Sequence, residues 1–128
     1  MEAMAVTQKL IVIGLLLLAT LLTGIWLGQL GKPLSPALST VHKLLGLAWV
    51  IFSVIRIYHA ARLIQPSTAQ FAVIAILGVL MVALIASGSV LTIPKLASAT
   101  WLNLHRIASA FAVIATAAAV RPFILSRH

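Results

Sequence analysis

Long apolar stretches alternate with short polar breaks along the whole chain. The stretches run over about residues 10–30, 41–63, 71–93 and 101–125. A bilayer core of about 30 Å is crossed by about 20 helical residues, and each stretch reaches that length. The pattern therefore predicts four transmembrane helices and an all-α fold.

Glycine and proline concentrate in the breaks, where they end helices and turn the chain. The breaks are Gly31-Lys32-Pro33 with Ser35-Pro36, Gln65-Pro66-Ser67, and Pro94-Lys95. Such short connections make neighbouring helices antiparallel, so we expect an up-down-up-down four-helix bundle in a single membrane domain over residues 1–128. The first stretch exceeds a signal-peptide core and no A-x-A-like site follows it, so we expect a retained helix.

Composition agrees with a membrane protein. The chain is 62% hydrophobic and 8% charged, with a mean hydropathy of +1.19. So few charges exclude a soluble enzyme, a disordered tail and a disulfide scaffold. The absence of cysteine excludes thiolate metal sites, iron–sulfur clusters and covalently attached haem.

Basic residues give the chain a net charge of +8, but they are dispersed and lie mainly near the ends of the stretches. This distribution indicates contact with the lipid bilayer and no nucleic-acid partner. Five cations fall on the side of the termini and four on the other side, which favours cytoplasmic termini. The two groups are Lys9, Arg56, Arg62, Arg121 and Arg127, against Lys32, Lys43, Lys95 and Arg106.

The two halves of the chain share a pattern of small and basic residues. Thr23-Gly24 precedes His42, and Ser87-Gly88 precedes His105, with the glycine 18 and 17 residues before its histidine. A small residue, Gly46 or Ser109, follows each histidine by four positions and so lies on the same helix face. The similarity is either chance or a duplicated hairpin with a pseudo-two-fold axis, which would make the histidines equivalent.

His42 and His105 are expected at similar depth near one membrane surface, because their helices run in the same direction. A zinc site needs three or four ligands, and Glu2 is the only acid in the chain. Two imidazoles are sufficient to hold one haem b through both axial positions of its iron. The simpler interpretation is that each histidine is an interfacial residue bonded to a backbone carbonyl.

Neighbouring residues fit the haem interpretation. The short side chains of Gly46 and Ser109 would leave room for a flat macrocycle, and Ala108 and Ala112 would extend that surface. The cations that directly follow the histidines, Lys43 and Arg106, would meet the two propionates. The predicted cofactor site therefore consists of His42, His105, Gly46, Ser109, Lys43 and Arg106, with the two histidines as metal ligands.

Other polar residues leave alternatives open. Ser53 and Arg56 share the His42 face and would line a quinone pocket or a water-filled cleft. The simpler alternative is that Ser53 bonds a carbonyl of its own helix and Arg56 extends to the headgroups. His59 would lie near the opposite surface, either in contact with headgroups or, with His128, at a second haem.

Two segments resemble known families. His42-Lys43-Leu44-Leu45-Gly46, with Arg56 fourteen residues after the histidine, resembles a helix of the bacterial cytochrome b561 family. Ser87-Gly88 through Pro94 to Leu104-His105-Arg106 resembles hairpins of the haem A synthase bundle. The resemblance implies a histidine-ligated b-type haem in a bacterial inner membrane. The chain departs from these families, since it has no histidine in the first and third stretches and no acid beside the histidines.

The sequence thus predicts a small b-type cytochrome that relays electrons, possible partners being a quinone and a redox protein. With both axial positions filled, the iron has no open position for oxygen or a substrate. The alternative is a haem-free accessory subunit that packs in a larger membrane complex through its alanine- and glycine-rich helices. A transporter is disfavoured because no Asp or Glu lies in any stretch to exchange a proton.

Overall fold

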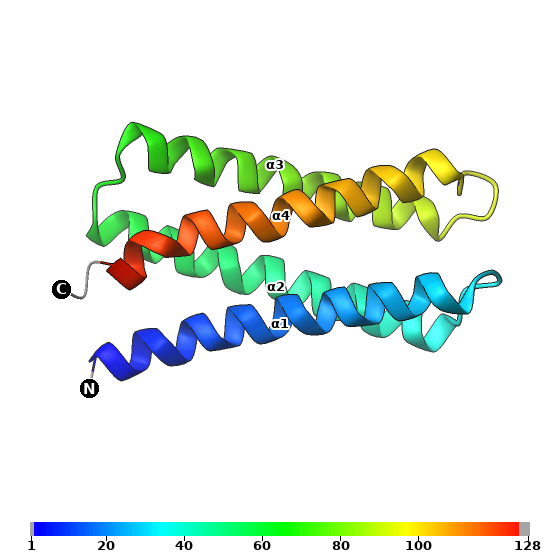
Figure 1. Cartoon of the computed structure of the whole chain (residues 1–128), viewed down its shortest axis with the longest axis horizontal. Helices are drawn as coiled ribbons and strands as arrows, with labels where there is room; N and C mark the ends of the chain where they lie inside the picture. Colours follow the sequence, from blue (N-terminus) through cyan, green and yellow to red (C-terminus); the bar gives the residue numbers. More distant parts are fainter. Residues whose placement is uncertain (1, 126–128) are drawn as a thin grey trace. The chain divides into compact units, whose positions relative to one another are not determined.

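The computed structural model describes residues 2–125, and four long helices account for most of them (Figure 1). The helices are α1 (Glu2–Leu30), α2 (Pro36–Leu63), α3 (Thr68–Leu91) and α4 (Ala99–Leu125). The predicted all-α fold with four helices is confirmed, and the breaks lie between the helices as expected.

A serine stands at the start of α2, α3 and α4. Ser67 forms a capping box with Gln70, in which the Ser67 hydroxyl accepts from the Gln70 amide and the Gln70 side chain accepts from the Ser67 amide. The Ser35 and Ser98 hydroxyls accept from amides three residues later, at 3.4 Å in both cases. These three helices therefore begin two to five residues before the apolar stretches that predicted them, because each first turn is set by its cap.

The other end of α1 has an equally local cause. Gly31 follows the helix directly and has φ of 71°, a left-handed conformation that glycine adopts without a steric penalty. Pro36 is the first residue of α2, a position where the missing N–H has no helical partner to lose. The break predicted from glycine and proline is thus a helix C-terminus followed by a helix N-terminus.

The chain divides into two compact units, residues 1–59 and 60–128, each of which we describe by itself. Hairpin 1 (residues 1–59) consists of α1 and most of α2, and hairpin 2 (residues 60–128) is formed chiefly by α3 and α4. The two helices run antiparallel within each hairpin (Figure 1). The prediction of a single domain over residues 1–128 stays a prediction.

Large apolar side chains point outwards from every helix. Examples are Leu15, Leu44, Val79 and Ile114, with exposed fractions of 59, 61, 70 and 65%. Such a surface is unfavourable in water and suits hydrocarbon, while the helices satisfy their own backbone hydrogen bonds. All four helices are long and apolar enough to cross a membrane, which fits the predicted integral membrane protein.

Candidate functional site

The imidazole of His42 is held by hairpin 1. Its Nδ1 atom lies 2.9 Å from the backbone oxygen of Thr20 and 3.1 Å from the hydroxyl oxygen of Thr23, both on α1. The Thr23 hydroxyl itself lies 2.9 Å from the Ala19 carbonyl, to which it donates. The ring is half-buried and directed at the neighbouring helix of its own hairpin.

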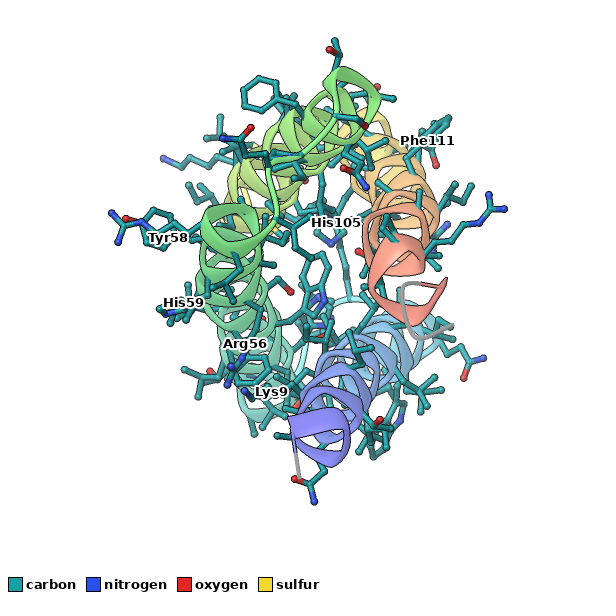
Figure 2. All side chains as sticks on the ribbon, turned by 90° about the vertical axis from the view of Figure 1, so that its left-hand side faces the viewer. Lys9, Arg56, Tyr58, His59, His105 and Phe111 are labelled. Carbon is teal, nitrogen blue, oxygen red and sulfur yellow. The ribbon has the colours of Figure 1, made fainter. Side chains whose placement is uncertain are left out.

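The imidazole of His105 is held in the same manner by hairpin 2. Its Nδ1 atom lies 2.8 Å from the hydroxyl oxygen of Ser87 on α3, and Ser87 is 1% exposed. The Ser87 hydroxyl donates to the Ala83 carbonyl at 2.6 Å, so a lone pair of its oxygen faces His105. Figure 2 labels His105 on α4.

These partners determine where each neutral ring carries its proton. A backbone carbonyl only accepts, so His42 Nδ1 donates to Thr20. The Ser87 hydroxyl has the Ala83 carbonyl as its own acceptor, which favours His105 Nδ1 as the donor to Ser87. This tautomer has its proton on Nδ1 and its basic nitrogen at Nε2. Histidines that bind metals typically donate from the other ring nitrogen in this way, which orients the ring and raises its basicity.

A glycine faces each ring from the neighbouring helix. A Cβ added to Gly24 would lie 2.9 Å from His42 Cε1, and one added to Gly88 would lie 3.3 Å from His105 Cε1. The first distance is shorter than real Cβ contacts, and the second is tighter than most of them. The glycines therefore allow the rings to approach the backbone closely.

A hydroxyl-bearing residue, a glycine and a histidine meet in both hairpins, and we call this arrangement the histidine clamp. The clamp of hairpin 1 is Thr23, Gly24 and His42, and that of hairpin 2 is Ser87, Gly88 and His105. A chance likeness between apolar sequences would not place each matched hydroxyl and glycine against the matched histidine. The clamps thus support duplication of a helical hairpin. The bond between His42 and the Thr20 carbonyl is the one that the simpler interpretation predicts.

The small residues after the histidines have local contacts. Gly46 faces α1, where an added Cβ would lie 3.5 Å from the Thr20 methyl group. The Ser109 hydroxyl donates to the His105 carbonyl of its own helix at 2.7 Å. Ala108 and Ala112 are buried.

The remaining predicted residues lie at the surface or beyond the described chain. Lys43, Arg106 and His59 are exposed, and His59 meets Tyr58 edge to face with 5.9 Å between ring centroids. His128 and Arg127 lie outside the described residues. Among the side chains that the structure describes, no group of three or more His, Cys, Asp or Glu residues could hold a metal ion.

A second polar feature on α2 contains Ser53 and Arg56, which sequence reasoning placed on the His42 face, and Trp49, which it missed. The Nε1 atom of Trp49, the hydroxyl of Ser53 and the Nε atom of Arg56 are buried without a hydrogen-bond partner. The expectation that Ser53 bonds a carbonyl of its own helix was wrong. Residues 42, 49 and 56 are spaced by seven, so the helical period that placed Ser53 on the His42 face would also have found Trp49.

Comparison with protein-family models, with curated proteins and with solved structures found no match to this chain. Its function is therefore argued from its own residues. In each hairpin one imidazole is oriented by an oxygen of the neighbouring helix.

Proposed function

We propose that this chain is a membrane b-type cytochrome in which His42 and His105 are the axial ligands of one haem. The histidine clamp carries the proposal. Two histidines in two hairpins donate from Nδ1 to an oxygen on the neighbouring helix and rest against a glycine. A structural histidine needs only a satisfied hydrogen bond, whereas a matched pair with Nε2 basic and oriented is what an iron requires.

The residues present fit such a group. When bound, the haem would supply one-electron transfer at its iron. Thr20 and Ser87 would keep the Nδ1 protons in place, and Gly24 and Gly88 would let the rings sit close to the backbone. The exposed cations Lys43 and Arg106 would attract the propionate carboxylates near the headgroups.

The proposal includes partners and a location. A quinol would supply electrons and a redox protein at the membrane surface, or a larger membrane complex, would accept them. The lipid bilayer would surround the apolar faces of the helices, in a bacterial inner membrane with cytoplasmic termini. Protease cleavage of a terminal tag in sealed inverted vesicles, but not in right-side-out vesicles, would support that orientation. The reverse pattern would contradict it.

An absorbance spectrum tests the function. Protein purified from cells supplied with haem should show a Soret band, with sharp α and β bands after reduction. His42→Ala and His105→Ala should each abolish the six-coordinate spectrum, and His59→Ala, which changes an exposed histidine on the same helix as His42, should preserve it. A colourless wild-type protein would reject the cytochrome and favour a haem-free accessory subunit.

A further inference from the structure

Three buried donors without partners follow one face of α2. Trp49 and Ser53 are each 2% exposed, and the Nε atom of Arg56 is buried although its side chain is only half-buried. Steps of four and three residues place the three side chains within about 40° of the direction of His42. Each atom carries a proton to donate, and each is without an acceptor.

Ser53 is the most informative of the three. Hydroxyls in apolar helices usually donate to a carbonyl three or four residues earlier. Thr20, Ser87, Ser109 and Thr116 all do so here, with distances of 2.6–2.7 Å. Ser53 does not take this bond, although the same kind of carbonyl is within its own helix. Its hydroxyl is therefore available to another acceptor.

Hairpin 2 provides a natural comparison. The 63 positions that separate His42 from His105 relate Trp49 to Ala112 and Ser53 to Thr116. Ala112 has no donor, and the Thr116 hydroxyl donates to the Ala112 carbonyl at 2.7 Å. The polar file formed by Trp49, Ser53 and Arg56 thus belongs to one half of the repeat only.

We propose that internal water molecules fill this polar file and link its three donors. The file needs acceptor oxygens, and the only acid in the sequence is Glu2, far from these positions along the chain. A buried water molecule typically makes about three hydrogen bonds to polar groups that otherwise have no partner. Water also donates, so one molecule can accept from one side chain and donate to the next.

The position of the file determines what such water would do. Arg56 is about 10 Å along the axis from the end of α2 at Leu63, and Trp49 is about 10 Å deeper. Figure 2, viewed from the end of hairpin 1 that carries the N-terminus, labels Arg56 on α2 and Lys9 on α1. The file would therefore bring water from that end to the middle of the span, on the face of α2 that carries His42. It would give protons a route into the span.

The absence of cysteine makes a direct test possible. Ser53→Cys and Thr116→Cys exchange buried hydroxyls for thiols at matched positions of the two hairpins. Both full-length variants, reconstituted in vesicles, would be treated with the water-soluble reagent methanethiosulfonate ethylammonium. The Ser53→Cys variant should react at least roughly tenfold faster, as expected when water reaches one site and not the other.

Two outcomes of the labelling experiment would overturn the proposal. Equal, slow reaction of the two variants would show that water does not reach position 53. Reaction of Ser53→Cys with a lipid-soluble maleimide only would indicate a pocket open to apolar molecules instead. In denaturant, the same reagent should label both thiols fully, which confirms that both are still reactive.

A second measurement keeps Ser53 and does not depend on a new thiol. The Trp26→Phe/Trp101→Phe variant leaves Trp49 as the one indole. After transfer to D₂O, the indole N–H should exchange within minutes. A shift of the Raman band that is sensitive to the indole N–H measures this exchange. A Trp49 N–H that stays protonated for hours would contradict the water file. A variant that retains only Trp101, which is 37% exposed, gives the rate for an accessible indole.

Discussion

The Cε1 atom of His42 lies 2.9 Å from the position that a Cβ would occupy on Gly24. The corresponding distance between His105 and Gly88 is 3.3 Å. Each histidine ring thus lies close to the backbone of the neighbouring helix, and an added Cβ would require the ring to shift, more at Gly24 than at Gly88. This approach makes the glycines positioning residues for the proposed axial ligands.

Adding one methyl group should test the two clamps in a graded way. Gly24→Ala should destabilise the protein by about 1–3 kcal/mol, the usual range for an overpacked contact, because His42 must move. Gly88→Ala should destabilise the protein less, since a shift of His105 by a few tenths of an ångström relieves the close contact. Unfolding in detergent, followed by circular dichroism, measures both effects.

Gly14→Ala and Gly78→Ala are the matched controls, because nothing lies within 4 Å of their added Cβ atoms. Each should be neutral or stabilising by up to about 1 kcal/mol, the ordinary gain of alanine over glycine in a helix. If Gly24→Ala behaved like Gly14→Ala, the close approach of His42 to α1 would be refuted. A reconstituted haem should show altered ligation in the Gly24→Ala variant and not in Gly14→Ala or Gly78→Ala.

Removing the hydroxyl beside His105 should weaken hairpin 2. Ser87→Ala leaves the buried Nδ1–H without this acceptor, at a cost of about 1–3 kcal/mol. Ser89→Ala removes an exposed hydroxyl that bonds the Ile85 carbonyl and should change stability by less than about 0.5 kcal/mol. Urea or detergent unfolding of both variants gives the comparison, and equal stabilities would argue against the His105–Ser87 bond.

The exposed cations next to the histidines should affect haem retention more than folding. Lys43→Ala and Arg106→Ala should each leave stability within about 0.5 kcal/mol of the original protein. Haem loss to apomyoglobin should nevertheless become faster in both, because a carboxylate loses a charge-assisted bond. Lys95→Ala, which changes an exposed cation in the connection between α3 and α4, is the control. If all three variants lost haem at the same rate, the proposed contacts of Lys43 and Arg106 with the propionates would be refuted.

Helix number and the connections were predictable from sequence because they follow from long apolar runs and from glycine and proline. The helix starts were not, because polar first turns lie outside the apolar runs. Ser67 and Gln70 form a recognisable capping box, and attention to that pair would have placed the start of α3 correctly. The internal repeat was visible because the residues of the clamp are short motifs at nearly equal spacing.

The roles within the repeat were harder to predict. Thr23 and Ser87 were matched by position, but sequence alone does not show that their hydroxyls meet a histidine nitrogen. Likewise, Ser53 lay on the expected face, yet only the structure shows that its hydroxyl avoids the carbonyl of its own helix. Side-chain rotamers and contacts between helices decide both points, and neither leaves a periodic signal.

The most direct test of the cytochrome is the electron paramagnetic resonance spectrum of the oxidised protein, recorded with its haem content. Two histidine ligands predict one low-spin ferric centre with about one haem per chain, converted to high spin or lost in His42→Ala and in His105→Ala. A protein without haem, or a centre that neither substitution changes, would contradict the account.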